Sequence, residues 1–213
     1  GLLTGNRRTG VNFFTSAWSK ALMATLGIDL NVLGAENLRA QRPAVFIFNH
    51  QSAVDMLVLC KLLRRDFVGI GKQEIRKNPI FSPLMSLAGT VFIDRFHHEK
   101  AIQALRPAID ALRHGISLAI APEGTRSTTP HPGPFKKGAF HIAMQAGVPV
   151  IPIVIRNAGQ IFWRNASTVR PGTIDVAVLD PIDVSGWDPD DLDARVEAVR
   201  RSYQDTLLHW PAE

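Results

Sequence analysis

The sequence has one cysteine, Cys60, and one tyrosine among its 213 residues. A single thiol cannot form an intrachain disulfide or a thiolate-rich metal cluster, and such low cysteine usage fits a reducing compartment. Long hydrophobic runs are also missing: the longest, residues 148–155, is broken by proline and falls far short of the roughly 18 apolar residues of a spanning helix. Polar low-complexity tracts are absent, which disfavours disorder. We therefore predict a folded chain with no membrane-spanning helix.

What is present suits one α/β domain, because 46% of the residues are hydrophobic and only 20% are charged. Lysine and arginine outnumber aspartate and glutamate by 24 to 19, which gives a formal charge of +5. A basic chain favours an anionic partner such as nucleic acid, an acidic membrane surface or a phosphorylated substrate. Nucleic acid is supported by charge alone, since the chain contains no recognition motif for it. We therefore expect no nucleic-acid partner.

Apolar periodicity predicts strands that alternate with helices. We expect strands at residues 28–34, 44–49, 66–71, 90–94, 116–122, 149–155 and 174–180, and helices at residues 53–65, 79–87, 98–113, 137–145 and 188–207. Pro107 should kink or split its helix, and Asp188 should be the N-cap of the last one. This order predicts a mixed, mostly parallel sheet covered by helices on both faces, with ligands bound by loops at the carboxyl ends of the strands.

The N-terminal segment has the pattern of an amphipathic helix. Within residues 11–26, Phe14, Trp18 and Leu22 recur at helical spacing. Such a helix can pack on the protein's own core. It can equally lie in a lipid interface, where tryptophan and phenylalanine are favoured and Lys20 can reach the headgroups. The residues themselves leave both interpretations open.

A histidine and an aspartate stand at one strand-to-helix junction. His50 follows the buried run at residues 44–49, and Asp55 lies in the first turn of the next helix. A carboxylate that accepts one ring N–H would orient the imidazole and leave its other nitrogen free to take a proton from a substrate hydroxyl. The same residues also fit a capping box with Ser52 as the N-cap. Ser52 lacks the G-x-S-x-G context of a nucleophile, and Cys60 lies within an apolar helix where an inert thiol is expected.

Two further polar stretches leave predicted strands. "APEGTRS", residues 121–127, combines a glycine that permits close backbone approach with an arginine that can bind an oxyanion through two hydrogen bonds. It predicts a phosphate-binding loop. "GTVFIDR", residues 89–95, ends with Asp94 and Arg95, a pair that by itself is more typical of an ordinary surface ion pair.

Together these stretches resemble the glycerolipid acyltransferases, the family typified by lysophosphatidate acyltransferase. The first block of that family, N-H-x-S-x-x-D, occurs here as Asn49, His50, Ser52 and Asp55. The other three blocks follow in order as "GTVFIDR", "PEGTRS" and the proline-containing apolar strand "VPVIPIVI". The four blocks span about half of the chain, and each lies at a predicted strand.

The resemblance implies a role for each matching residue. His50 would be the general base and Asp55 the partner that orients it. A second group of residues would bind the phosphate of the acceptor: Lys72, Arg95, Glu123, Gly124, Thr125 and Arg126. Lys72 is included because family members often carry a lysine at that place. Residues 148–155 would help to form the acyl-donor side. No metal or cofactor is implied, and the cluster at residues 97–99 is expected to face solvent.

The implied reaction moves a fatty acyl group from acyl-CoA or acyl-carrier protein to the free hydroxyl of lysophosphatidate, giving phosphatidate. Residues 1–27 would form a membrane-surface helix and residues 28–213 the acyltransferase domain, attached peripherally to the cytoplasmic side of a membrane. Three alternatives stay open. The acceptor could be glycerol-3-phosphate or another lysophospholipid, the donor could be a phospholipid, or the chain could be a noncatalytic lipid-binding module, although intact His50 and Asp55 argue against the last.

Overall fold

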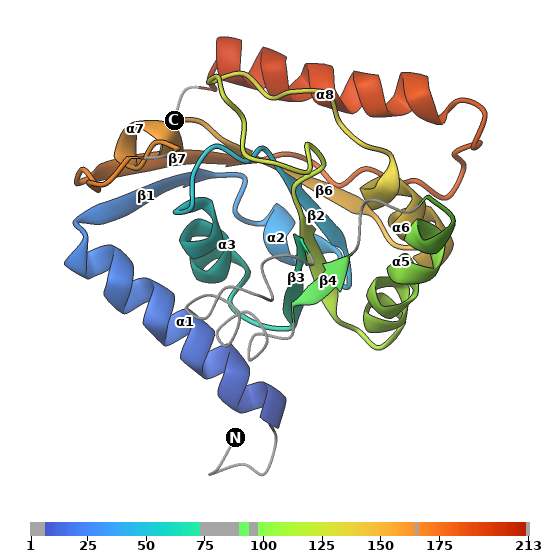
Figure 1. Ribbon diagram of the computed structural model, residues 1–213, viewed down its shortest axis with the longest axis horizontal. Coiled ribbons are helices and arrows are strands. Elements are labelled where there is room, and N and C mark those ends of the chain that lie inside the picture. The colour runs from blue at the N-terminus through green and yellow to red at the C-terminus, as the bar shows by residue number, and fades with distance from the viewer. Residues whose placement is uncertain (1–6, 73–89, 94–97, 165, 212–213) are drawn as a thin grey trace.

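The computed structural model describes residues 7–72, 90–93, 98–164 and 166–211, so the helix predicted at residues 79–87 lies outside the described part. Seven strands form one sheet in the order β1-β7-β6-β2-β5-β3-β4 (Figure 1). Their bounds are β1 (Ile28–Leu33), β2 (Val45–Phe48), β3 (Phe67–Lys72), β4 (Val91–Ile93), β5 (Ser117–Ile120), β6 (Val150–Ile155) and β7 (Gly172–Val178). All seven predicted strands are therefore present.

The sheet is mixed and mostly parallel, as predicted. The neighbours β6, β2, β5, β3 and β4 pair in parallel, whereas β7 is antiparallel to β6 and parallel to β1. Strand β2 lies in the middle and is buried at all four positions, which explains its unbroken apolar run. The carboxyl ends of β2, β5 and β6 consequently meet at one edge of the sheet.

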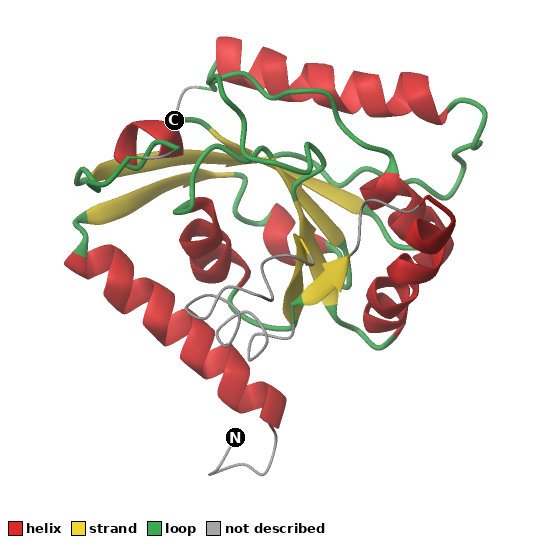
Figure 2. Cartoon of the chain, viewed as in Figure 1, coloured by secondary structure: helices red, strands yellow, loops and turns green. Residues whose placement is uncertain are grey.

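Helices cover both faces of the sheet (Figure 2). Their bounds are α1 (Arg7–Thr25), α2 (Asn37–Ala40), α3 (Asp55–Leu63), α5 (His98–Arg113), α6 (Gly138–Ala146), α7 (Ala158–Ile161) and α8 (Leu192–Leu208). Alternate residues of β2 supply the two halves of the core. Phe46 and Phe48 pack with α1, α3 and α7, while Val45 and Ile47 pack with α5, α6 and α8.

Two predicted helix features differ in the structure. Helix α5 runs past Pro107 to Arg113 without splitting. Helix α8 begins at Leu192, so the prediction of Asp188 as its N-cap is wrong. The Oδ1 atom of Asp188 instead accepts the N–H of Asp190 at 2.9 Å. Aspartate side chains form such local turns readily, and here the turn precedes the helix.

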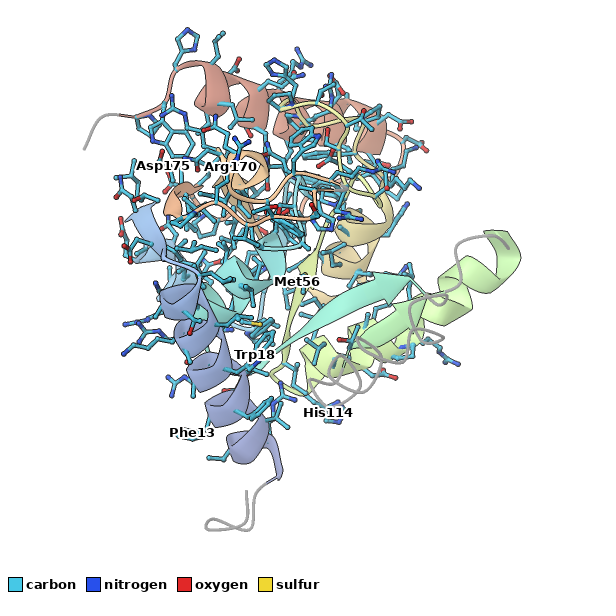
Figure 3. The ribbon with its side chains drawn as sticks, turned by 60° about the vertical axis from the view of Figure 1, so that its left-hand side comes forward. Phe13, Trp18, Met56, His114, Arg170 and Asp175 are labelled. Carbon is cyan, nitrogen blue, oxygen red and sulfur yellow. The ribbon has the colours of Figure 1, made fainter. Side chains whose placement is uncertain are left out.

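Helix α1 has a packed face and an exposed one. Met23 is buried, and Trp18 and Leu22 pack against the same core as α3. Phe13 and Phe14, near the N-terminal end of the helix, are 76% and 43% exposed, and Figure 3 labels Phe13. Phe14 is in line with Trp18 and Leu22 but does not pack as they do. The packing interpretation thus holds for the part of the helix that carries Trp18, Leu22 and Met23, while two aromatic rings nearer its start remain in solvent. No helix within the described residues is long and apolar enough to cross a membrane.

Two buried side chains join β2 to β6 close to the carboxyl end of the sheet. The hydroxyl of Tyr203, from α8, donates to the carbonyl of Ile47 at 2.7 Å and accepts the N–H of Ile153 at 3.2 Å. The amide of Asn49 exchanges two hydrogen bonds of 2.8 Å with the backbone of Ile155. The chain therefore leaves β2 from a fixed point.

We expect Tyr203→Phe to lower the free energy of unfolding by about 1–3 kcal/mol, because the buried carbonyl and N–H lose their shared partner. Burial raises the pKa of the Tyr203 hydroxyl, which keeps its proton available for this bridge. Urea unfolding measures the change. Ser202→Ala is the matched control, since that hydroxyl donates to the carbonyl of Val199 within α8, and we expect a change of at most about 0.5 kcal/mol. Equal losses in the two variants would contradict the bridge.

Candidate active site

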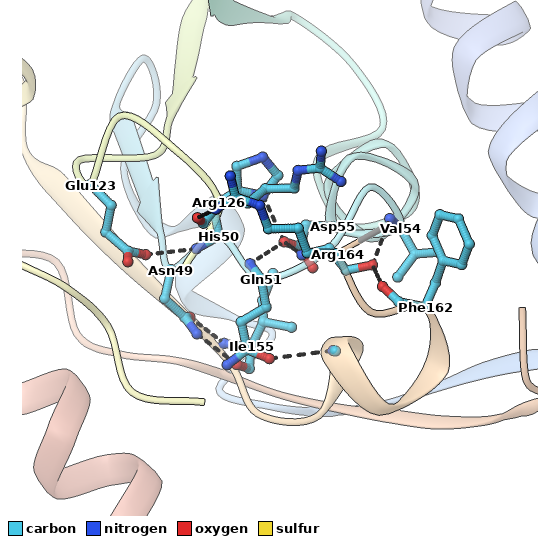
Figure 4. Close-up of polar contacts among 12 residues, drawn as sticks. Asn49, His50, Gln51, Val54, Asp55, Glu123, Arg126, Ile155, Phe162 and Arg164 are labelled. Atoms are coloured by element: carbon cyan, nitrogen blue, oxygen red, sulfur yellow. Dashed lines mark hydrogen bonds and ion pairs between the residues drawn. The ribbon is translucent and has the colours of Figure 1, made fainter. Parts of the chain in front are cut away.

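The predicted histidine and aspartate contact each other directly. Nδ1 of His50 lies 2.7 Å from Oδ2 of Asp55, which is fully buried (Figure 4). The same oxygen accepts the backbone N–H groups of Gln51 and Ser52, each at 2.8 Å. A carboxylate can only accept, so the ring must donate its Nδ1–H and carry its free lone pair on Nε2. The imidazole is thereby oriented with Nε2 available as a base.

The alternative roles of this segment have structural answers. Helix α3 begins at Asp55 with Val54 as its N-cap, so the alternative with Ser52 as the N-cap of a capping box is wrong. The carboxylate of Asp55 nevertheless accepts the N–H of Ser52 with the same oxygen that contacts the histidine. The hydroxyl of Ser52 donates to the carbonyl of Phe162 and accepts from Val54, so it is engaged in holding loops together. Burial raises the pKa of Cys60 to about 11, which makes the thiol a poor nucleophile.

Glu123 fixes the backbone of the histidine. One carboxylate oxygen accepts the N–H of His50 and the other that of Gly133, both at 2.9 Å. The side chain is buried, and this desolvation raises the pKa of Glu123 although the two backbone hydrogen bonds oppose the shift. The resemblance assigns this residue to phosphate binding, but the structure places both oxygens against backbone donors. In this position Glu123 acts on the site by holding His50.

The predicted phosphate loop lies against the histidine. The N–H of Ser127 donates to the carbonyl of His50 at 2.6 Å. Gly124 has a φ of +76°, a conformation that favours glycine and turns the loop. Thr125 is exposed, and Arg126 is half-buried. The loop therefore presents an arginine and an exposed hydroxyl beside the base.

The structure describes less of the two remaining predicted phosphate ligands, Lys72 and Arg95. Lys72 is the last residue of β3 and pairs with Ile93 of β4, at the carboxyl end of strands parallel to β2. Arg95 lies outside the described residues. Phosphate binding by these two side chains stays a prediction. Within the described ranges, no three metal-ligating side chains converge.

A third loop, which follows β6, belongs to the site and was not predicted. The side-chain amide of Gln51 donates to the carbonyl of Pro130 at 3.0 Å and accepts the N–H of Gly159 at 3.3 Å. Nη1 of Arg164 donates to the carbonyl of Arg126 at 3.1 Å. Gly159 and Arg164 of this loop lie outside the four sequence blocks. The available signal was only their position after a strand whose carboxyl end faces the site.

A histidine held by a buried carboxylate at the end of a central parallel strand, beside an arginine-bearing loop, is an arrangement suited to general-base chemistry in an α/β enzyme. Comparison with known protein families identifies the family to which the chain belongs. The acyltransferase family model matches residues 29–156, more than half of the chain. The chain belongs to this acyltransferase family.

Individual relatives agree with this family. The chain is 34% identical to a 1-acyl-sn-glycerol-3-phosphate acyltransferase of Cocos nucifera and to one of Saccharomyces cerevisiae, over 92% and 85% of its own length. These matches cover only 63% and 61% of the relatives, so the chain spans less than two thirds of either. The human 1-acyl-sn-glycerol-3-phosphate acyltransferase beta is 32% identical over 98% of this chain and 76% of its own.

The fold is also shared with a solved structure. The crystal structure of the 1-acyl-sn-glycerophosphate (LPA) acyltransferase PlsC from Thermotoga maritima superposes with a TM-score of 0.81. The match covers 100% of this chain and 86% of the other at 28% identity. The similarity therefore extends over the sheet, its covering helices and the loops of the candidate site.

Proposed function

We propose that the protein is a 1-acylglycerol-3-phosphate O-acyltransferase, which acylates the free hydroxyl of lysophosphatidate and produces phosphatidate. The names of its relatives support the acceptor. The observation that carries the chemistry is the 2.7 Å contact between Nδ1 of His50 and Oδ2 of Asp55. It leaves Nε2 free to act as a base where the loops after β2, β5 and β6 meet. His50 keeps 21% of its side-chain surface exposed, so a substrate can reach it.

In this mechanism the acceptor hydroxyl gives its proton to Nε2 of His50 as its oxygen attacks the carbonyl carbon of the acyl thioester. Asp55 stabilises the imidazolium that forms. The carbon–sulfur bond then breaks, and the departing thiolate takes the proton from the imidazolium. The donor is acyl-CoA or acyl-carrier protein, and neither an acyl-enzyme nor a cofactor is needed. Such base catalysis contributes about 10²–10⁴ in rate.

In this proposal the phosphate of the acceptor binds beside the "PEGTRS" loop. Arg126 can bind a phosphate through two parallel hydrogen bonds, and Gly124 and Thr125 form the turn before it. Lys72 and Arg95 would add positive charge from the neighbouring strand ends. Glu123 supports this loop and His50 from behind through its backbone contacts.

A substrate panel tests the proposal. The purified protein is given an acyl-CoA or an acyl-carrier protein with lysophosphatidate, glycerol-3-phosphate or other lysophospholipids, and thiol release and acylated product are measured. We expect the highest kcat/KM with lysophosphatidate. Preference for glycerol-3-phosphate or for another lysophospholipid would reassign the acceptor, and acyl transfer from a phospholipid without thiol release would reassign the donor. Lipid binding without transfer to any acceptor would indicate a noncatalytic module.

We expect Glu123→Gln to lower kcat about 10- to 100-fold while the protein stays folded. A glutamine has one acceptor oxygen, so either His50 or Gly133 loses its partner, and a small displacement of the base carries a cost of this size. Steady-state kinetics and circular dichroism measure both effects. Glu197→Gln is the control, because this half-exposed carboxylate pairs with Arg200 on α8. Full activity of Glu123→Gln would remove Glu123 from the site.

We also infer that α1 attaches the protein peripherally to the cytoplasmic side of a membrane. Phe13 and Phe14 are exposed large apolar side chains, and Lys20 on the same helix is exposed as well. Aromatic rings beside cationic side chains are favoured in the interface of an anionic bilayer.

We expect the double variant Phe13→Ser and Phe14→Ser to bind anionic vesicles at least tenfold more weakly, since burying one phenylalanine is worth about 1.5–3 kcal/mol. Co-sedimentation with the vesicles measures the binding. Leu208→Ser is the control, because Leu208 is 74% exposed but lies on α8, on the other side of the sheet from α1 (Figure 1). Equal binding of the double variant and the unsubstituted protein would exclude α1 as the attachment.

A further inference from the structure

Three loops are fastened together around the histidine, and they leave β2, β5 and β6 at the same edge of the sheet. The N–H of Ser127, in the β5 loop, donates to the carbonyl of His50. The hydroxyl of Ser52, in the β2 loop, donates to the carbonyl of Phe162 in the β6 loop. A side chain on the β6 loop is therefore held at a defined place relative to the imidazole.

Arg164 is the cationic side chain that this loop directs into the site. Its Nη1 donates to the carbonyl of Arg126, and it is half-buried. The preceding residue fixes the loop, because the ring of Trp163 lies so close to Gly159 that a Cβ atom there would come within 2.5 Å of it. Figure 4 draws Arg164 and Arg126 beside His50.

The charge around these arginines is unbalanced. In the part of the chain that the structure describes, no carboxylate lies within ion-pair distance of Arg126 or Arg164. The nearby carboxylate of Glu123 has both oxygens engaged by backbone N–H groups. The guanidinium of Arg164 thus lies at the backbone of the predicted phosphate loop without a carboxylate to balance it, and a planar guanidinium suits a phosphate.

We propose that Arg164 is a further ligand of the acceptor's phosphate, an inference that rests on the proposed function. A guanidinium has five N–H donors, so Arg164 can keep its bond to the carbonyl of Arg126 and still donate to a phosphate oxygen. In lysophosphatidate acylated at the first position, the free hydroxyl and the phosphate are on neighbouring carbon atoms. With the hydroxyl at Nε2 of His50, the phosphate is therefore within reach of the loops that carry these two arginines, because the β5 loop contacts the backbone of His50 and Arg164 contacts the β5 loop.

The test compares Arg164→Gln with the unsubstituted protein. We expect the KM for lysophosphatidate to rise about 10- to 100-fold, as for loss of a charge-assisted hydrogen bond, with little change in kcat or in the donor KM. Arg164→Lys should recover part of the loss. Arg170→Gln removes the same charge from an exposed position six residues further along and should keep the original KM. A fall in kcat with an unchanged KM, or no change at all, would overturn the inference.

A binding measurement separates this inference from the proposed function. Calorimetry with lysophosphatidate is done on His50→Ala, in which turnover is suppressed, and on His50→Ala with Arg164→Gln. We expect about 10- to 100-fold weaker binding in the double variant. If the unsubstituted protein transfers no acyl group yet the double variant shows this loss, the proposed function fails and the phosphate contact stands. Equal binding by both proteins rejects Arg164 as a ligand.

Discussion

We expect His50→Ala to lower kcat for lysophosphatidate acylation by about 10²–10⁴, with the acceptor KM changed little. Without the imidazole, the attacking hydroxyl has no group to take its proton, whereas the phosphate contacts that bind the acceptor are retained. Thiol release from acyl-CoA measures the rate. Circular dichroism checks the fold, which should persist because His50 is partly exposed and lies in a loop.

His114→Ala is the matched control for this substitution. His114 is an exposed histidine whose Nδ1 lies 2.7 Å from the carbonyl of Asp110 at the end of α5, so its loss should leave kcat within about twofold. Turnover by folded His50→Ala at a rate comparable with the control would reject His50 as the base. It would also leave the 2.7 Å contact with Asp55 as a structural contact alone.

The second large effect is expected for Asp55→Asn, with a fall in kcat of about 10²–10⁴. Oδ2 of Asp55 accepts from three donors, and an asparagine has one acceptor oxygen and no charge. If its NH2 group faces the ring, the three donors lose their acceptor; if its oxygen does, the imidazolium still loses the negative charge that stabilises it, and the NH2 group occupies the buried place where Oδ1 has no partner. Either orientation should lower the free energy of unfolding by about 1–3 kcal/mol, because a buried polar group is left unpaired. Kinetics and urea unfolding test the two effects separately.

A double-variant cycle shows whether the two residues act as one unit. His50→Ala combined with Asp55→Asn should be no slower than His50→Ala, since orienting an absent ring has no value. Multiplying effects would contradict the pair. Asp193→Asn is the control for the charge change, because this exposed carboxylate pairs with Lys137 at 2.7 Å on the surface.

The sequence predicted those features that depend on neighbours along the chain. The unbroken apolar run of β2 indicated a central strand, and the run proved buried on both faces. The spacing between His50 and Asp55 indicated a pair, because one loop and the first turn of α3 bring them together. The same local reasoning misplaced the start of α8, because Asp188 can form a turn with its own backbone as readily as it can cap a helix.

The contacts of the supporting residues could not be predicted, because their partners are distant in the sequence. Glu123 contacts the backbone of a residue 73 positions away, and Tyr203 contacts one 156 positions away. Apolar periodicity does not indicate contacts between residues so far apart along the chain. Arg164 is a basic residue in a polar loop, and only the folded sheet shows that this loop ends beside Arg126. Local patterns left the role of the pair open until the family resemblance favoured catalysis, while the groups that hold the pair required the tertiary structure.

The hydrogen bonds around His50 make the first sequence block depend on segments far along the chain. Glu123, Ile155 and Phe162 follow the residues they contact by 73, 106 and 110 positions. Tyr203 follows its partner in β2 by 156 positions. A fragment that carries the histidine and its aspartate but lacks these segments would therefore keep the pair and lose the groups that hold its backbone.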